Sequence, residues 1–264
     1  MLKKLLHYDL KWCIKVVIIY YGLAFVFACI GRLLEITPDT TFWNIVVGIC
    51  KGIGVSLAIT GLVNCIIRMW VRMGINMYKD ESYLTHTLPI DIRLHFLSKF
   101  LATVIMILSS IIIILICVVI MYANKESIET FKNMFKILSN SVEGSIAIGI
   151  ILVILTILAE FIFIVMVGFL GIVIGHRSNT KKALKSVLIG IGTYFGCNLI
   201  TGVLMILGAL FSTQLYSMLF EQATAMEYTF LCMLLFSAFL IYSVYIVIIY
   251  LIINRNLQKG INID

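Results

Sequence analysis

The chain has 264 residues, of which 62% are hydrophobic and only 12% are charged, and its mean hydropathy is +1.10. Soluble globular domains carry about 25% charged residues, so this composition excludes a water-soluble fold and indicates an integral membrane protein. The formal net charge is +7. Because the cations flank long apolar runs, we interpret this charge as a sign of membrane topology and predict no nucleic-acid partner.

Six apolar runs are long enough to cross a bilayer. A helix needs about 20 residues to span a hydrocarbon core of about 30 Å. The runs that reach this length are Trp12–Leu34, Phe42–Ile67, Phe100–Tyr122, Ile146–Ile174, Val187–Phe211 and Phe230–Ile253. They lack the alternation of apolar and polar residues that is typical of barrel strands. The predicted fold is an all-α membrane protein with six transmembrane helices in one domain, residues 1–264.

The positive charges predict the orientation of these spans. Most of the twenty lysines and arginines fall at the two ends of the chain and in the second and fourth loops. Cations beside a span resist translocation, so both termini are predicted to lie in the cytoplasm, with the chain in a bacterial-type cytoplasmic membrane. Residues 1–11 alternate leucines with cations at helical spacing. This pattern predicts an amphipathic helix on the inner membrane surface.

No catalytic or metal-binding residue is predicted. Intramembrane proteolysis needs paired aspartates, a Ser and His pair or a His-Glu-x-x-His motif inside the bilayer, and the spans contain none of these. Asp91 and His95 share one helix face, but we interpret them as a helix cap and a solvated histidine. The seven cysteines lie in or beside spans without a Cys-x-x-Cys pair, which favours packing residues over disulfides or a metal site.

The charged stretch 68–99, between the second and third spans, has its own local signals. No proline occurs in the second span or after it until Pro89, so the helix is expected to continue past Ile67. Asp80 is a plausible N-cap, and Pro89 cannot continue a helix, which together predict a short helix over about 81–88. Asp91 is expected to cap the next helix.

The residues of this stretch follow the order Asp-Glu-x-Tyr-Leu-Thr-x-Thr-Leu-Pro-[Val/Ile], then Ser-Lys and a new span. The matching positions are Asp80, Glu81, Tyr83, Leu84, Thr85, Thr87, Leu88, Pro89, Ile90, Ser98 and Lys99. This order resembles the first cytoplasmic loop of ABC transporter permeases of the type-2 exporter class. Ser82 stands where Gly is commoner in that loop, which weakens any need for a left-handed backbone there.

The resemblance implies a half-transporter that pairs with a second permease copy, identical or a close paralogue, above two copies of a cytoplasmic ABC ATPase. ATP and Mg would be bound by the ATPase and no cofactor by this chain, which has no Gly-x-x-x-x-Gly-Lys-[Ser/Thr] motif. The short helix would then couple the two proteins. Leu84, Leu88 and Tyr83 would fill a groove in the ATPase, and Asp80 and Glu81 would meet groups at its rim.

The cargo implied by the resemblance is amphipathic or hydrophobic, as in peptide exporters and pumps for antimicrobial or cytolytic peptides. The spans carry no cluster of charges suited to a polar ion, which favours the same class. Two other functions stay open: an ion-coupled secondary transporter that uses Glu160, and a membrane scaffold of a sensor or resistance complex.

Glu160 lies near the middle of the fourth span, where a carboxylate costs about 2.5 kcal/mol or more on insertion scales. It is therefore predicted to face protein or water, either as a translocation-pathway residue that contacts cargo or a proton, or as a protonated carboxyl bonded to a neighbouring helix. Lys51, in the outer half of the second span, is expected either to pair with Glu160 or to extend its stem to the external interface.

Three Gly-x-x-x-Gly pairs mark possible close approaches of helices. They are Gly48 and Gly52, Gly171 and Gly175, and Gly192 and Gly196. We expect Gly48 and Gly52 to contact the second permease. The external segment 212–229 is unusually apolar for a loop, and predicts either a re-entrant or interfacial helix or an extension of the fifth span.

Overall fold

The computed structural model describes residues 1–36, 40–79, 81–87, 90–141, 145–178, 180–220 and 227–259. Within these ranges every regular element is a helix, and six of the helices are long and apolar enough to span a membrane. The predicted all-α fold with six candidate spans is therefore confirmed, and the chain is a helical, multi-pass membrane protein. It divides into two compact units, Met1–Met134 and Phe135–Asp264, which are described separately.

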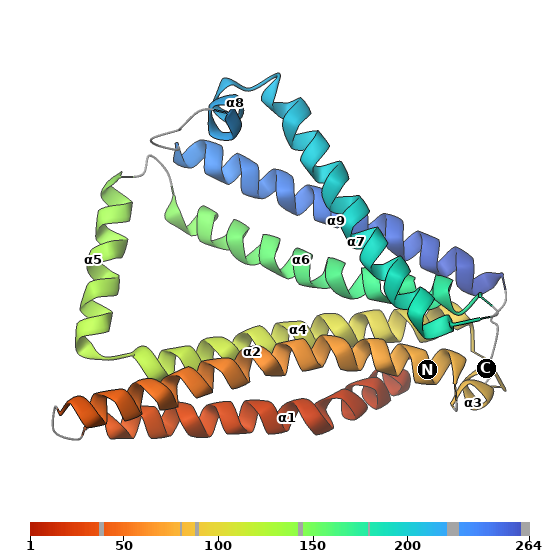
Figure 1. Ribbon diagram of the computed structural model, residues 1–264, viewed down its shortest axis with the longest axis horizontal. Helices are drawn as coiled ribbons and strands as arrows, with labels where there is room; N and C mark the ends of the chain where they lie inside the picture. The colour runs from red at the N-terminus through yellow and green to blue at the C-terminus, as the bar shows by residue number, and fades with distance from the viewer. Residues whose placement is uncertain are drawn as a thin grey trace. The chain divides into compact units, whose positions relative to one another are not determined.

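Unit 1 is built from three long helices that pack side by side: α1 (Leu2–Leu34), α2 (Thr41–Tyr78) and α4 (Ile92–Tyr122) (Figure 1). Mostly small side chains form a buried core between them, because small residues let helix backbones approach closely where lipid supplies no hydrophobic driving force. This core contains Ala24, Ala28, Ala58, Cys117 and Met121. All seven cysteines of the chain are free.

The N-terminal residues are not a separate surface helix. They form the first turns of α1, which runs without interruption from Leu2 to Leu34. No proline or glycine occurs before Gly22, so nothing in this stretch breaks the helix. Asp9 is buried in this part of α1, and it anchors the N-terminal turns to the rest of unit 1.

The second span continues as predicted. α2 runs through Arg68 and ends at Tyr78, and a six-residue helix, α3 (Ser82–Thr87), follows it. Asp91 caps α4, since its side chain accepts a hydrogen bond from the Arg93 amide at 3.0 Å. Asp80, Leu88 and Pro89 lie outside the described residues, as do the side chains of Leu84 and His86.

A helix that the apolar pattern does not predict, α5 (Lys125–Ser141), occupies the stretch between the third and fourth spans. This stretch contains no proline or glycine and several good helix formers, which explains its conformation. Its charged residues make it too polar to be one of the six candidate spans. The boundary between the two units falls within α5.

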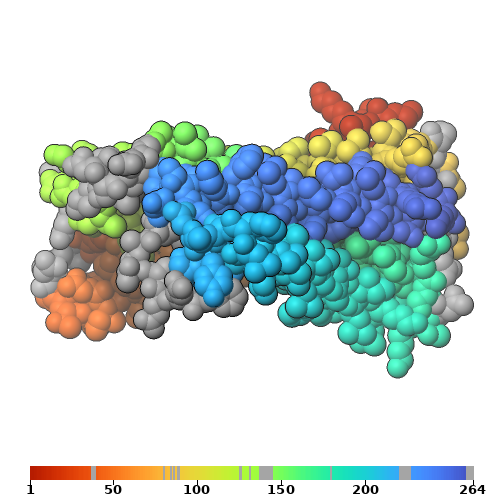
Figure 2. Space-filling view, turned by 90° about the horizontal axis from the view of Figure 1, so that it is seen from above, coloured from red at the N-terminus to blue at the C-terminus, as the bar shows by residue number. Residues whose placement is uncertain are grey.

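Unit 2 centres on α6 (Ile146–Gly175), which packs against both α7 (Lys182–Ala209) and α9 (Tyr228–Gln258). Figure 2 shows the face of unit 2 that carries α7 and α9. At one end, α6 approaches α7 so closely that a Cβ on Gly171 would lie 2.5 Å from the Ser186 carbonyl oxygen. A Cβ on Gly175 would also collide with Ser186. This Gly-x-x-x-Gly pair therefore packs helices within one chain.

The segment after α7 forms a separate short helix, α8 (Thr213–Phe220). The chain turns at 210–212 before α8 begins, so α8 is not a continuation of the fifth span. Leu215 is buried and packs toward Gly208 of α7. Gln214 donates a hydrogen bond to the Glu227 carboxylate at 2.8 Å. Residues 221–226 of this predicted segment lie outside the description.

A charge cluster ties the three helices of unit 1 together where α1 and α4 end. Glu35, directly after α1, accepts hydrogen bonds from Lys51 of α2, from Asn124 at 3.0 Å and from Arg32 at 2.5 Å. Partial burial alone would raise the pKa of the Glu35 carboxyl. The three donors outweigh that effect and lower the pKa to about 2. Lys51 also lies over the Tyr122 ring, 5.0 Å from its centroid.

This cluster predicts an acid-sensitive stability. Because the pKa of Glu35 is lower in the folded protein than its ordinary value of 4.5, the carboxylate stabilises the fold above about pH 4.5. That contribution is lost as the pH falls from 4.5 toward 2. Thermal unfolding of the purified protein should show the loss, and Glu35→Gln should remove that part of the pH dependence. Glu129→Gln, at an exposed position of α5, is the matched control. Identical pH profiles for the two variants would contradict the assignment.

Candidate functional site

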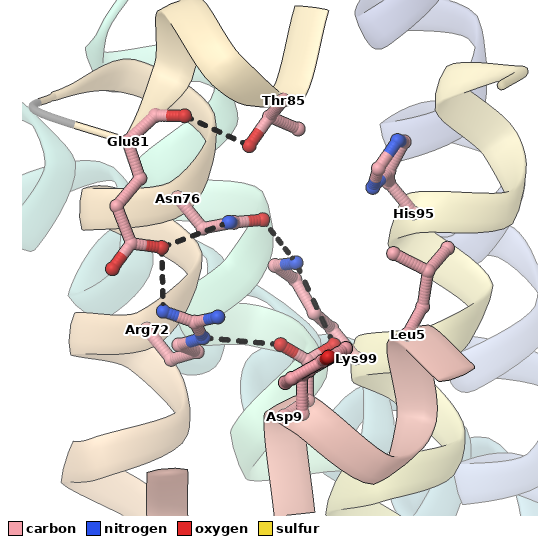
Figure 3. A pocket seen from close by; sticks show the side chains of 9 residues that line it. Leu5, Asp9, Arg72, Asn76, Glu81, Thr85, His95 and Lys99 are labelled. Carbon is pink, nitrogen blue, oxygen red and sulfur yellow. Dashed lines mark hydrogen bonds and ion pairs between the residues drawn. The ribbon is translucent and has the colours of Figure 1, made fainter. Parts of the chain in front are cut away.

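A buried network of charged residues lies at the other end of unit 1, where α1 begins and α2 ends (Figure 3). Arg72 of α2 donates from Nε to Asp9 Oδ1 at 3.0 Å, and Ser98 of α4 donates to Asp9 Oδ2 at 2.8 Å. Lys99 Nζ lies 3.7 Å from the same Oδ2 atom. The side chains of Asp9, Arg72 and Lys99 are only 5%, 10% and 2% exposed. One carboxylate therefore joins α1, α2 and α4.

The same network extends to the start of α3. Arg72 donates from Nη1 to Glu81 Oε2 at 2.6 Å, and Asn76 Nδ2 donates to that oxygen at 3.1 Å. Lys99 Nζ donates to Asn76 Oδ1 at 2.6 Å. Arg72 thus binds two carboxylates at once through its forked guanidinium, which suits such bridging better than a lysine ammonium would. Arg72 therefore links Glu81, at the start of α3, to Asp9 of α1.

The positive charges of Arg72 and Lys99 balance the negative charges of Asp9 and Glu81 in this network. A buried ion pair contributes little net stability, because desolvation offsets the attraction, but removal of one partner leaves an uncompensated buried charge. The network therefore specifies the relative positions of these helices more than it stabilises the fold. Its hydrogen bonds are directional, so few other packings of the same helices would satisfy them.

α3 depends on this attachment because a helix of six residues is too short to be stable alone in water. Its Ser82 and Thr85 side chains are buried, and Thr85 Oγ1 donates to the Glu81 carbonyl oxygen at 2.9 Å. Tyr83, by contrast, is 68% exposed, and Thr87 is exposed as well. The helix therefore packs one face on unit 1 and presents another to its surroundings. Ser82 has an ordinary right-handed helical backbone, as expected for a residue other than glycine.

A cavity of about 220 Å³ lies beside the network and is lined mainly by polar side chains. Its lining residues come from α1, α2, α4 and the chain at α3, and include Tyr8, Asn76 and His95. His95 is 3% exposed, so the expectation of a solvated histidine is wrong. It is buried because α4 turns it toward the first helix, where Leu5 also lines the cavity. Asp91 acts as a helix cap, as predicted.

The structure gives Glu81 a role that the sequence pattern does not indicate. Its carboxylate contacts Arg72 and Asn76 of this chain and is 41% exposed. The exposed part of this side chain is the part that could contact an ATPase, and that contact stays a prediction. The sequence pattern does not predict the burial of Asp9 or its bond to Arg72. The available signal was that Asp9 is the only carboxylate among the first 34 residues, surrounded by lysines at the start of an apolar run.

Glu160, the candidate pathway residue, is half-buried in α6 of unit 2. It lies close enough to Tyr242 of α9 for an electrostatic interaction. An aromatic cluster adjoins this site, with Phe163 ring centroids 5.5 Å from Tyr242 and 5.7 Å from Tyr245. Both proposed roles of Glu160 stay predictions. Lys51 is bonded to Glu35, which directly follows α1. This contact is compatible with the expected extension of the lysine stem toward the external interface, and a pairing of Lys51 with Glu160 stays a prediction.

Gly48 and Gly52 have no close packing partner among the described residues. A Cβ at either position would meet no atom within 4 Å among the described residues. They contrast with Gly171 and Gly175, whose close approach is internal to unit 2. The α2 face at Gly48 and Gly52 is therefore open to lipid or to another chain, and the predicted contact with a second permease stays a prediction.

Comparison with known proteins gives no family assignment: no family model matches the chain, and no curated protein or solved structure matches it. A functional assignment therefore depends on the motif and on the geometry of the charge network. Within the part of the chain that the structure describes, no group of three or more His, Cys, Asp or Glu side chains is placed to hold a metal ion.

The network predicts a large cost for removing either central partner. Arg72→Gln leaves Asp9 without its main counter-charge, and Asp9→Asn leaves Arg72 and Lys99 in excess. Each should destabilise the protein by about 3 kcal/mol, since both charges are buried. Arg177→Gln, which removes an exposed arginine bonded to Asn256 at 2.6 Å, should cost at most about 1 kcal/mol. Denaturation of the purified variants measures these differences. Equal stabilities for Arg72→Gln and Arg177→Gln would contradict the network.

Proposed function

We propose that this chain is the transmembrane subunit of an ATP-driven ABC exporter of the type-2 class. The observation that carries the proposal is α3, a short helix that bears the loop motif, follows the long α2 helix and exposes Tyr83. A six-residue helix that is fixed on one face and exposed on the other is suited to dock into a groove of a soluble partner. Tyrosine is among the residues that dominate such interfaces.

The charge network suggests how a movement of α3 would reach the membrane helices. Glu81 is joined to Arg72 of α2, and Arg72 is joined through Asp9 to α1 and α4. A displacement of α3 by a partner would therefore act on three helices together. In the proposed mechanism, closure of two ATPase subunits moves both coupling helices and switches the transporter between inward-open and outward-open states.

The energy source in this proposal is a separate subunit, because the chain lacks a phosphate-binding loop of the Walker type. ATP and Mg would bind there, one ATPase under each of two paired permeases. Apolar side chains are exposed along α7, among them Leu199, Ile200 and Val203. Such a surface suits contact with lipid or with a second permease. It also suits contact with an amphipathic cargo such as a cytolytic or antimicrobial peptide.

Two alternatives make different predictions for the same reconstituted system. An ion-coupled transporter that uses Glu160 would move cargo without nucleotide, and its transport would depend on an ion gradient. A scaffold of a sensor complex would bind its partner without stimulating hydrolysis. Cargo-stimulated ATP hydrolysis by the chain together with its candidate ATPase is expected only for the ABC exporter.

Interface variants of α3 test the docking directly. Tyr83→Asp should strongly reduce co-purification with the candidate ATPase, because it places a charge in the apolar centre of the proposed contact. The sequence motif predicts the same loss for the double substitution of Leu84 and Leu88 by Asp. Phe42→Asp is the control: Phe42 is equally exposed, at 67%, but lies in the first turn of α2, far along that helix from α3. Undiminished binding by the Tyr83 and leucine variants would rule out the coupling role.

A further inference from the structure

Arg68 and Trp12 form a stacked pair on the surface of unit 1. The Arg68 guanidinium carbon lies 4.4 Å from the Trp12 ring centroid, within the range of a cation–π contact. Trp12 begins the first predicted span, and Arg68 directly follows the second. Both residues therefore lie at the predicted cytoplasmic boundary of the membrane, where tryptophan side chains are enriched at the level of lipid headgroups.

Arg68 differs from its neighbour Arg72 in its partners among the described residues. Arg72, one turn further along α2, is held by Asp9 and Glu81, whereas Arg68 makes no ion pair or hydrogen bond with any described residue. Its Nε atom is buried without an acceptor.

The surroundings of the pair are positive and aromatic. Tyr8 and Lys15 lie four residues before and three residues after Trp12, which places them on the same face of α1. Both are exposed. The nearest acid along α1, Asp9, is buried and bonded to Arg72 and Ser98. Arg72, which also lies over the Trp12 ring at 5.5 Å from its centroid, is bonded to Asp9 and Glu81, whereas neither Arg68 nor Lys15 forms an ion pair with a carboxylate of the described residues.

Exposed apolar residues extend this face toward the middle of the first span. Ile19 and Leu23 follow Trp12 on the same side of α1 and are 58% and 45% exposed. On α2, Ile67 is also exposed beside Arg68. An acyl chain could therefore lie along the helices while its headgroup stays at the level of Arg68. This combination of a basic headgroup level and an apolar track is what a phospholipid requires.

We propose that Arg68, Trp12 and Lys15 bind the headgroup phosphate of an anionic phospholipid in the cytoplasmic leaflet. The forked guanidinium of Arg68 donates to the phosphate oxygens, Lys15 adds a second positive charge, and Trp12 holds the guanidinium in place. A zwitterionic lipid is disfavoured because the cationic part of its headgroup would be repelled by Arg68 and Lys15. The inference goes beyond the proposed transport function, since it needs no ATPase and no cargo.

Fluorescence quenching by brominated lipids tests the site. Replacing Trp43 and Trp70 with Phe leaves Trp12 as the sole tryptophan, because the chain has three. The full-length protein is reconstituted in phosphatidylcholine with a minor fraction of brominated phosphatidylglycerol or brominated phosphatidylcholine. Trp12 should be quenched preferentially by the brominated phosphatidylglycerol. Arg68→Gln should reduce that preference about fivefold, Arg68→Lys should reduce it less, and Arg177→Gln should leave it unchanged.

Several results would overturn the proposal. Equal quenching of Trp12 by the two brominated lipids in the parent protein would show that no anionic lipid is selected. An unchanged preference in Arg68→Gln would show that this arginine does not select it, and if that variant does not fold, Lys15→Gln at an exposed position supplies the second comparison. Loss of the preference on adding millimolar inorganic phosphate would assign the site to a soluble anion, whereas its retention supports a lipid.

Discussion

The packing of α1, α2 and α4 at the end of unit 1 where α1 begins depends on the carboxylate of Asp9. It is buried among three helices, and a buried negative charge is tolerated only where donors surround it. Arg72, Lys99 and Ser98 supply those donors, and each comes from α2 or α4. Because Asp9 holds Arg72 in place, the remaining N–H groups of Arg72 are fixed in direction, and one of them donates to the Glu81 carboxylate. The position of α3 therefore follows from a contact made by the first helix of the chain.

Unit 1 is polar at its two ends and apolar between them. Lys51, paired with Glu35, and Arg72, paired with Asp9, are separated along α2 by about 31 Å at 1.5 Å per residue, close to the thickness of a hydrocarbon core. Small residues such as Ala24, Ala28 and Ala58 pack the middle. Three helices that are joined by ionic contacts at both ends and packed closely between them are expected to move together. This property suits a unit that passes a movement at α3 across the membrane.

The sequence predicts features whose cause is local and misses those whose cause is tertiary. Span length predicts the six long helices, and the absence of proline before Pro89 predicts the continuation of α2 through Tyr78. Asp91 is recognisable as a cap because its bond to the Arg93 amide is made within two residues. The Asp9 contacts join residues 63 and 89 positions apart, so no local pattern reveals them. α5 was missed for a different reason, since its polar composition is compatible with a loop as well as a helix.

Hydrogen exchange of the α3 amides measures directly whether the charge network holds α3 in place. A six-residue helix has almost no intrinsic protection, so any protection must come from its attachment to unit 1. Glu81→Gln keeps the shape of the side chain but weakens the bond to Arg72. We expect protected amides at 82–87 in the parent protein and exchange about tenfold faster in Glu81→Gln. Unprotected amides in the parent, or the same exchange rates in both proteins, would contradict it.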